Sequence, residues 1–360
     1  MMIPFAVIHF IQGVHPVFYL RSMVLLFSVY VFSLAFYQFL RLCHTLRTLY
    51  KQLLLINIVL VGLAIVALAW PFLSKILWYS NELTLIYNVR RLRLFTYEAS
   101  YYSLLLAPIA LYYYIKLLLL KLPDPLLTFL LVTIPLLLSL SFGVILGLIL
   151  SLLFTILWSI RYLLTNKKFV YLFLGCTVLL LIGGYILLRF PDNFISLRLS
   201  KIFSGRDTSF QGRTIDSFYL GYKIAELKSI WFGAGPGQTK ELGLELFRTY
   251  YNHPTLPVDE IRIPNAAGDT LASFGLVGLS LRMVLEIWFF FSTRVYNNYY
   301  RLSLFVFIFI YQFTGSYITN IVEYSIWIMA FYPGLMEEFD RSAIRHQYLA
   351  VRRPQKPITT

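Results

Sequence analysis

The chain has 360 residues, of which 59% are hydrophobic, 18% aromatic and only 13% charged, with a mean hydropathy of +0.71. Soluble domains carry about 25% charged residues, so these values exclude an ordinary soluble protein and indicate a polytopic membrane protein. The net charge of +14 combines cytoplasmic anchoring charge with any anion site, and by itself predicts no nucleic-acid partner. The two cysteines, Cys43 and Cys176, offer neither a disulfide framework nor a metal-ligand spacing.

Apolar stretches long enough to cross a bilayer recur along most of the chain. About 20 apolar residues span a hydrocarbon core of ~30 Å, and by this measure we predict about nine spans. They cover residues 19–40, 53–73, 101–120, 126–140, 144–160, 169–188, 270–292, 302–318 and 321–335. Residues 1–19, which Pro4, Gly13 and Pro16 interrupt, predict an interfacial or re-entrant segment before the first span.

We therefore expect an all-α fold, a polytopic transmembrane helical bundle of about nine spans with one large extracytoplasmic loop. Lys and Arg concentrate in the short loops after alternate spans and in the tail, which marks those segments as cytoplasmic. Four regions follow: an N-terminal transmembrane bundle at 1–190, the extracytoplasmic loop at 191–264, C-terminal transmembrane helices at 265–336 and a cytoplasmic basic tail at 337–360.

One outer segment breaks this charge rule. Residues 74–100 lie outside by the same reasoning, yet they carry Lys75, Arg90, Arg91 and Arg93. A cluster of cations in the disfavoured compartment predicts anion binding, and contact with the phosphates of lipid headgroups is the alternative explanation.

The longest polar interval begins near Lys201, and we expect the chemistry of the chain there. Arg198, Lys201, Arg206 and Arg213 occur within sixteen residues. Guanidinium groups bind phosphate in a bidentate manner, so several of them can neutralise a diphosphate. Apolar and aromatic residues at helical spacing predict a helix over 215–227 that lies along the membrane interface.

A glycine-rich segment, WFGAGPGQ at 231–238, follows that helix. Its three glycines and one proline in eight residues predict a tight turn whose backbone N–H groups face an anion. No GKS or GKT follows the turn, so it is not expected to bind a nucleotide as a P-loop does. Gly235 and Gly237 are the candidate substrate-binding residues of this turn.

The order of four motifs resembles the O-antigen ligase/polymerase superfamily, which comprises integral-membrane glycosyltransferases of bacterial surface polysaccharides. These motifs are Gly212-Arg213, the FGAGPG turn, Asn265 and the FGLVGL segment at 274–279. Upstream, RLFTYEAS at 93–100 and LSLSFG at 138–143 resemble two further family motifs, so the resemblance covers about residues 85–335. The chain departs from the family pattern at Pro264, where a His often precedes the Asn, and at Ala99 and Phe142.

This resemblance implies an enzyme that polymerises polyprenyl-diphosphate-linked oligosaccharide repeat units into O-antigen, capsule or exopolysaccharide at the bacterial inner membrane, with the outer loop catalytic. The implied partners are the lipid-linked oligosaccharide, membrane lipids, a chain-length regulator and a flippase, and no nucleic acid. No cofactor or metal is expected, because the sequence shows no metal-ligand cluster of Asp or Glu. Arginines are then expected to stabilise the charge on the departing diphosphate.

The resemblance and the charge pattern together name the expected site. The catalytic candidates are Arg213, Arg206, Arg93, Glu98 and His253, and the substrate-binding candidates are Arg91, Gly235, Gly237, Asn265 and Asp269. The acceptor hydroxyl needs a general base, a role that stays open among His253, Glu98, Asp259, Glu260 and Asp269. His253 is alternatively a surface histidine, and Asp269 alternatively pairs with an arginine or caps the helix that begins near Thr270.

Three other functions stay open. An O-antigen ligase would transfer the finished glycan to a different acceptor, and Pro264 in place of the family's His counts against it. A flippase or exporter would show internal repeats and broken helices in matching halves, and the sequence shows no repeat. A non-catalytic scaffold would tolerate Arg213→Ala, whereas a polymerase would lose chain elongation. Arg301, expected in an inner loop, is predicted to be dispensable for elongation.

Overall fold

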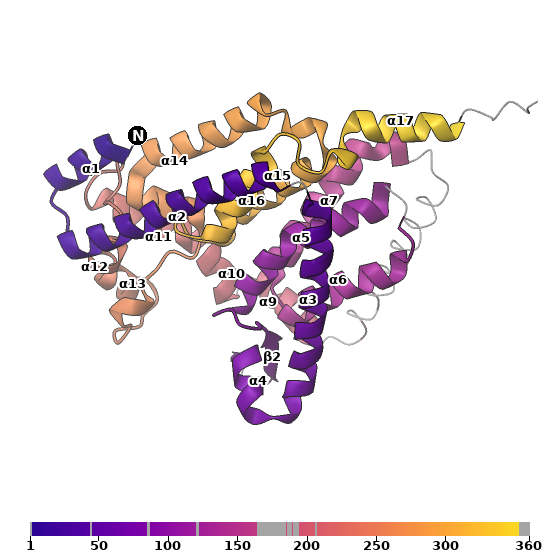
Figure 1. Cartoon of the computed structure of the whole chain (residues 1–360). Helices are drawn as coiled ribbons and strands as arrows, with labels where there is room; N and C mark the ends of the chain where they lie inside the picture. The colour runs from indigo at the N-terminus through magenta and orange to yellow at the C-terminus, as the bar shows by residue number, and fades with distance from the viewer. Residues whose placement is uncertain are drawn as a thin grey trace, which may run out of the picture. The chain divides into compact units, whose positions relative to one another are not determined.

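The computed structural model describes residues 2–43, 45–84, 87–119, 122–163, 185, 189, 194–205 and 207–352 (Figure 1). The chain forms two units, each assembled from distant parts of the sequence. Unit 1 comprises Met1–Phe39, Ile195–Ser292 and Ile308–Ile328, and unit 2 comprises Leu40–Phe194, Thr293–Phe307 and Met329–Thr360.

Five described helices are long and apolar enough to cross a membrane, which agrees with the expected helical membrane protein. They are α2 (Pro16–Leu42), α3 (Leu46–Val66) with the 3₁₀ turn η1 (Ala67–Ala69), α5 (Ala99–Leu119), α7 (Phe142–Leu163) and α14 (Ala266–Ser292). Three shorter apolar helices are α6 (Pro125–Ser139), α15 (Tyr299–Tyr311) and α16 (Ile321–Phe331). The total of about nine spans stays a prediction, because nearly all of the expected span 169–188 lies outside the described residues.

Helix α15 ends at Tyr311, whereas the predicted span ran to residue 318. Ser316 adopts a positive φ of 70°, which a helix interior does not allow. The carbonyls of Gly315 and Gln312 instead accept the amides of Ala266 and Ala267, each at 3.1 Å. The loop after α15 thus satisfies the free N–H groups at the start of α14, a long-range pairing that apolar periodicity does not reveal.

The other helices that lie mainly in unit 1 are short. They are α1 (Met2–Ile11), α9 (Phe194–Phe203), α10 (Thr208–Arg213), α11 (Ile215–Glu226), α12 (Thr239–Leu242), α13 (Leu244–Tyr250) and the 3₁₀ turn η2 (Val258–Glu260). Helix α11 confirms the prediction of a helix over 215–227. The described part of the interval 191–264, expected as one large loop, is otherwise built of short helices and turns.

Helix α11 packs on the first half of α14 through glycine. A Cβ on Gly221 would lie 2.7 Å from the carbonyl oxygen of Gly268, and one on Gly268 would lie 2.9 Å from that of Ser217. The two backbones therefore approach as closely as small residues permit. A buried apolar core surrounds this crossing and consists of Leu220, Ile224, Ala234, Phe247, Ile261, Ile263 and Ala272.

Unit 2 contains a β-hairpin that the all-α prediction did not include. Strands β1 (Trp78–Thr84) and β2 (Tyr87–Leu92) pair antiparallel and follow α4 (Pro71–Leu77) directly (Figure 1). At the open end of the hairpin Trp78 stands opposite Leu92, and both side chains are buried. The polar stretch 74–100, expected as a loop, is therefore partly a sheet held by two apolar residues.

Three tyrosines pack together in the core of unit 2. The rings of Tyr50, Tyr112 and Tyr300 pack edge to face with centroids 5.3 to 6.4 Å apart. The hydroxyls of Tyr50 and Tyr300 share a hydrogen bond at 2.8 Å, and the Tyr112 hydroxyl donates to Glu338 at 3.0 Å. Such rings bury large apolar areas while their hydroxyls stay satisfied. The unit also contains η3 (Val295–Asn297), η4 (Glu337–Phe339) and α17 (Arg341–Arg352).

Candidate functional site

Asn265 stands immediately before α14 and ties three segments of unit 1 together. Its Oδ1 accepts the amide of Gly268 at 2.9 Å, which is the bond of a helix N-cap. Its Nδ2 donates to the main-chain carbonyls of Arg213 at 2.7 Å and Phe313 at 2.5 Å. The side chain is 0% exposed and both its N–H groups are used, so Asn265 fixes the main chain of Arg213 instead of binding substrate as expected.

Arg213 lies at the junction of two helices. It is the last residue of α10, and α11 begins two residues later. Asp207 caps α10 through a carboxylate that accepts the amide of Phe210 at 2.8 Å. Beyond the junction, Asp216 stands in the first turn of α11, where the helix dipole stabilises a carboxylate. Arg213 and Asp216 therefore flank the junction, and only Arg213 was among the predicted site residues.

Tyrosine side chains surround the carboxylate of Asp216, a residue that is 8% exposed. Tyr250 and Tyr251 donate hydroxyl hydrogen bonds to it at 2.9 and 3.2 Å. The rings of Tyr219 and Tyr250 are exposed, with centroids 5.3 Å apart. Burial and the charge of Asp216 raise the pKa of Tyr251, so its hydroxyl keeps its proton and donates. We call Asp216 with Tyr219, Tyr250 and Tyr251 the Asp216 cluster.

The Asp216 cluster adjoins the Gly212-Arg213 motif. The Tyr251 hydroxyl would lie 3.7 Å from a Cβ at Gly212, and the Ser217 hydroxyl donates to the Gly212 carbonyl at 2.5 Å. The sequence held one signal of the cluster, a carboxylate three residues after the arginine of the motif. Its tyrosine partners stand in and after α13, so their contact with Asp216 was not visible in the sequence.

The glycine-rich turn, residues 231–238, and the preceding Ile230 pair with a break in α14. The helix is interrupted at Gly275, whose φ of 67° and ψ of −165° suit glycine alone. Four backbone bonds join turn and break, from Ala234 N to Ala272 O (2.9 Å), Gly235 N to Ser273 O (3.0 Å), Leu276 N to Ile230 O (2.9 Å) and Val277 N to Trp231 O (3.0 Å). The amide of Gly235 is thus used inside the protein, and the predicted anion cradle is wrong at this residue.

Glycine is required on both sides of this contact. A Cβ on Gly233 would lie 2.5 Å from the amide nitrogen of Phe274, and one on Gly275 would lie 2.4 Å from the carbonyl of Trp231. A Cβ on Gly237 would lie 2.4 Å from the carbonyl oxygen of Phe18 in α2. The structure therefore gives Gly237 a packing role, and its expected substrate contact stays a prediction.

Helices α1 and α2 hold the other side of the turn. His9 is fully buried, with Nε2 2.8 Å from the Phe232 carbonyl and Nδ1 3.2 Å from the Tyr19 hydroxyl. Burial lowers the pKa of His9, so the neutral ring donates from Nε2 and accepts at Nδ1. The side chain of Gln238 bonds both main-chain groups of His15, at 2.8 and 3.2 Å. Residues 1–19 thus brace the turn through helices.

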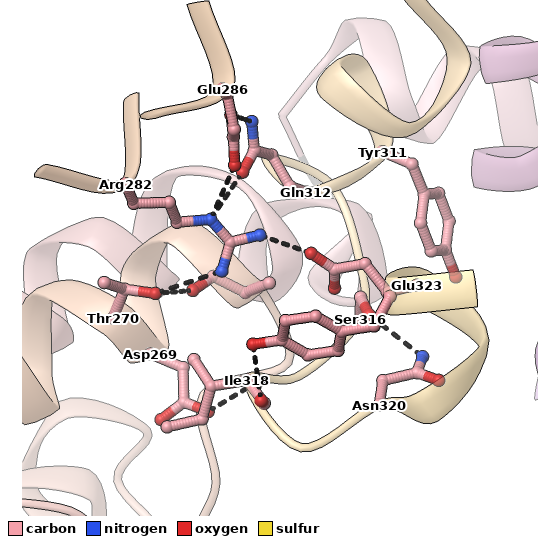
Figure 2. A network of polar contacts seen from close by, with 12 residues as sticks. Asp269, Thr270, Arg282, Glu286, Tyr311, Gln312, Ser316, Ile318, Asn320 and Glu323 are labelled. Atoms are coloured by element: carbon pink, nitrogen blue, oxygen red, sulfur yellow. Dashed lines mark hydrogen bonds and ion pairs between the residues drawn. The ribbon is translucent and has the colours of Figure 1, made fainter. Parts of the chain in front are cut away.

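A second polar group, which we call the Arg282 cluster, lies along α14 and comprises Thr270, Arg282, Glu286, Gln312 and Glu323 (Figure 2). Arg282 donates from Nε to Glu286 at 3.0 Å and Gln312 at 2.8 Å, and from Nη1 to Thr270 at 3.2 Å. Its Nη2 donates to Glu323. None of the cluster's members was among the predicted site residues, although charges one turn apart inside a predicted span are a signal of function.

Asp269 joins the start of α14 to the loop after α15. Its Oδ2 accepts the amide of Ile318 at 3.3 Å (Figure 2). The Tyr324 hydroxyl donates to the carbonyl of Ile318 at 3.0 Å. The helix-capping role considered for Asp269 belongs to Asn265. Asp269 instead fixes the polar loop against the helix.

Arg93 of unit 2 holds the end of α4. Its guanidinium donates to the carbonyls of Lys75 at 2.9 Å, Ile76 at 3.1 Å and Tyr97 at 3.4 Å. A guanidinium at a helix C-terminus satisfies free carbonyls and complements the dipole. The structure therefore gives Arg93 a capping role, and its expected catalytic role stays a prediction. Its expected meeting with Arg213 stays a prediction, because the two residues belong to different units.

Arg91 and Glu98, also of unit 2, each have a local structural contact. Arg91 donates from Nε to the carbonyl of Ser139 at 3.0 Å. Glu98 precedes α5, where its main-chain oxygen accepts the amide of Tyr102 at 3.2 Å and its carboxylate accepts the Ser100 hydroxyl. Their expected roles toward substrate stay predictions.

The remaining candidates lie at the surface or outside the described residues. His253 is exposed, in agreement with the alternative of a surface histidine, and Glu260 is exposed as well. Asp259 pairs with Lys240 at 3.5 Å through a fully exposed carboxylate. Arg206 lies outside the described residues.

No protein-family model and no curated protein matches the chain. The likeness to the O-antigen ligase/polymerase superfamily therefore depends on its motifs, and unit 1 brings four of them into contact. Asn265 holds the carbonyl of Arg213, and the glycine-rich turn pairs with the FGLVGL segment at Gly275.

Proposed function

We propose that this chain is an integral-membrane glycosyltransferase that joins polyprenyl-diphosphate-linked oligosaccharide units into a surface polysaccharide. The observation that supports this best is the contact among the four motifs. Asn265 holds the main chain of Arg213, and the glycine-rich turn braces the helix that Asn265 caps. A guanidinium held in this way stabilises the negative charge that develops on a departing lipid diphosphate.

The Asp216 cluster supplies the contacts that the acceptor saccharide needs. Exposed tyrosine rings offer apolar faces and hydroxyl groups to a sugar. Each Asp216 oxygen accepts one tyrosine bond and keeps a further lone pair for an acceptor hydroxyl. We assign Asp216 as the general base in place of exposed His253. The acceptor hydroxyl gives its proton to Asp216, its oxygen bonds the anomeric carbon, and the bond from that carbon to the diphosphate breaks.

In this proposal the chain lies in the bacterial inner membrane, with residues 191–264 outside and the C-terminal tail in the cytoplasm. A flippase delivers the lipid-linked units, and a chain-length regulator acts on the product. Reporter fusions after Arg93 and Arg213 test the orientation. Both are expected outside, and fusions on opposite sides of the membrane would remove residues 74–100 from the proposed site.

A strain that lacks the protein tests the function itself. A polymerase predicts that single lipid-linked repeat units accumulate on the outer leaflet. Long carrier-linked chains would indicate a ligase, and loss of all units from the outer leaflet would indicate a transporter. Asp216→Asn keeps a group that can bond both tyrosines but cannot act as a base, so it is expected to abolish elongation while the protein level stays normal.

One observation favours the transporter as the second candidate. Helix α14 is broken at Gly275, and broken helices are typical of transporters, whose freed backbone groups bind the substrate. In this chain, however, four of the backbone groups at the break pair with the glycine-rich turn. The break thus has a structural explanation, and the polymerase remains the first candidate.

A further inference from the structure

The Arg282 cluster holds three ionisable side chains in apolar surroundings. Arg282 and Glu286 lie one turn apart in α14, a candidate membrane span, and Glu323 comes from α16. Their side-chain exposures are 14%, 9% and 0% in that order. Ionisable groups placed in this way indicate a functional site by default.

Hydrogen bonds satisfy both oxygens of Glu286 but only one of Glu323 (Figure 2). Glu286 accepts from Arg282 at Oε1 and from Gln312 at Oε2, at 3.0 and 2.8 Å. Glu323 accepts from Arg282 at Oε1, whereas its buried Oε2 has no hydrogen-bond partner among the described residues. The hydroxyl of Tyr324 donates elsewhere, to a main-chain carbonyl at 3.0 Å.

Charge counting points to the same pair of carboxyl groups. With both carboxyl groups ionised, the cluster has two negative charges against one guanidinium. The other titratable groups on the contributing elements are Asp269 in α14, Tyr299, Tyr300, Arg301 and Tyr311 in α15, and Tyr324 in α16. Arg301 is the cation among these six, and its guanidinium donates to the main-chain carbonyls of Ala330 and Thr293 instead of to the Glu286–Glu323 pair. An uncompensated buried charge costs far more than a neutral carboxyl group with one unused hydrogen bond.

We propose that the Glu286–Glu323 pair binds one proton and that the Arg282 cluster is a proton-binding site of the folded chain. A metal ion suits the geometry less well. Among the described residues, no group of three or more His, Cys, Asp or Glu side chains is placed to hold one.

Proton exchange at this pair reaches the start of α14. The main chain of Gln312 accepts the amide of Ala267, and the next carbonyl, that of Phe313, accepts the side chain of Asn265. Loss of the proton places two negative charges beside one arginine, and their repulsion loosens the loop that holds Asn265. If the proposed function holds, chain elongation therefore slows as the pair deprotonates. The proton site itself does not depend on that function.

Infrared difference spectra between the wild type and each variant test the proposal. They are recorded on the purified full-length chain in lipid nanodiscs near neutral pH. The C=O stretch of one protonated carboxyl group is expected in the wild type and absent in Glu323→Gln. Glu286→Gln is expected to remove it as well, because one carboxyl group then faces one guanidinium and no negative charge is left uncompensated. Glu226→Gln is the matched control, since Glu226 is exposed and pairs with Lys223.

Thermal unfolding gives an independent readout. The folded chain binds a proton that the ionised carboxylates of the unfolded chain do not, so the wild type becomes more stable as pH falls from 8 to 6. This pH dependence is expected to be weaker in Glu323→Gln and unchanged in Glu226→Gln. A carboxyl band of equal intensity in Glu323→Gln and the wild type would overturn the proposal. Stabilisation by sodium at fixed pH, lost in Glu323→Gln, would also overturn it and assign a cation instead.

Discussion

Arg282 in unit 1 and Arg301 in unit 2 are both largely buried, and their partners differ in kind. Arg301 donates to the main-chain carbonyls of Ala330 at 2.9 Å, Phe331 at 3.3 Å and Thr293 at 2.9 Å. Arg282 donates to side chains, and two of these are the carboxyl groups of Glu286 and Glu323. Carbonyl dipoles at a helix end stabilise the charge of a guanidinium and do not themselves ionise. Two carboxyl groups beside one guanidinium would leave one negative charge uncompensated, so the pair is expected to bind a proton. We therefore expect Arg301 to join chain segments and Arg282 to belong to a cluster whose charge changes with pH.

The same comparison corrects the expectation for Arg301. The residue lies in α15 rather than in an inner loop, and it is 5% exposed. Replacing it with alanine is expected to lower the amount of folded protein, so this variant is a poor control for elongation. Lys240 serves better, because it is partly exposed and pairs only with the fully exposed Asp259 among the described residues.

The largest expected effect comes from Arg282→Leu. This change leaves two buried carboxyl groups without their guanidinium and is expected to cost about 3–5 kcal/mol of unfolding free energy. Thermal unfolding in detergent measures the loss. The control is the triple variant with Glu286→Gln and Glu323→Gln, which removes the charges together and should regain most of the stability. A triple variant as unstable as the single one would show that packing, not charge, explains the effect.

Arg301→Met is expected to be milder, at about 1–3 kcal/mol, because it leaves neutral carbonyls unsatisfied rather than charges. The loss should be the same at pH 6 and pH 8, since none of the partners of Arg301 named above titrates there. Unfolding at the two pH values measures this directly. A loss as large as that of Arg282→Leu, or one that varies with pH, would remove the distinction between the two arginines.

Asp216 extends the comparison to a buried anion held by neutral donors. Tyr251→Phe removes one hydroxyl bond to this carboxylate and is expected to cost roughly 1.5 kcal/mol. The pKa of Tyr251 is raised above its ordinary 10.0, so the folded chain keeps a proton that the unfolded chain releases. Stability is therefore lost as pH rises past that value, and Tyr251→Phe should weaken this alkaline dependence. Tyr222→Phe, at an exposed position of α11, is the control; an equal effect there would contradict the role of Tyr251.

The local features of the chain were predictable and the long-range pairings were not. Helical spacing predicted α11, and the three glycines of 231–238 predicted a turn. That the turn completes the break at Gly275 depends on backbone contacts some forty residues apart, which composition does not encode. For the same reason the sequence predicted Asn265 as a site residue but not its hydrogen bond to the main-chain carbonyl of Arg213.

The sequence contains signals of two further structural features. Arg282 and Glu286 stand four residues apart inside a predicted span, where any ionisable residue deserves a functional hypothesis. At the hairpin of unit 2 the sequence predicts a polar loop, because most of the residues are polar and only Trp78 and Leu92 indicate a buried face. The expected contribution of Arg206 and Arg93 to the diphosphate site at Arg213 stays a prediction.

The most direct test of the proposed function is the length distribution of the surface glycan in a deletion strain that expresses single variants. Arg213→Ala is expected to leave single repeat units with no longer chains, while Lys240→Ala, at equal membrane protein level, gives the wild-type distribution. Normal chain lengths in the Arg213→Ala strain would contradict the account, because the cation that it places at the departing diphosphate would then be unnecessary.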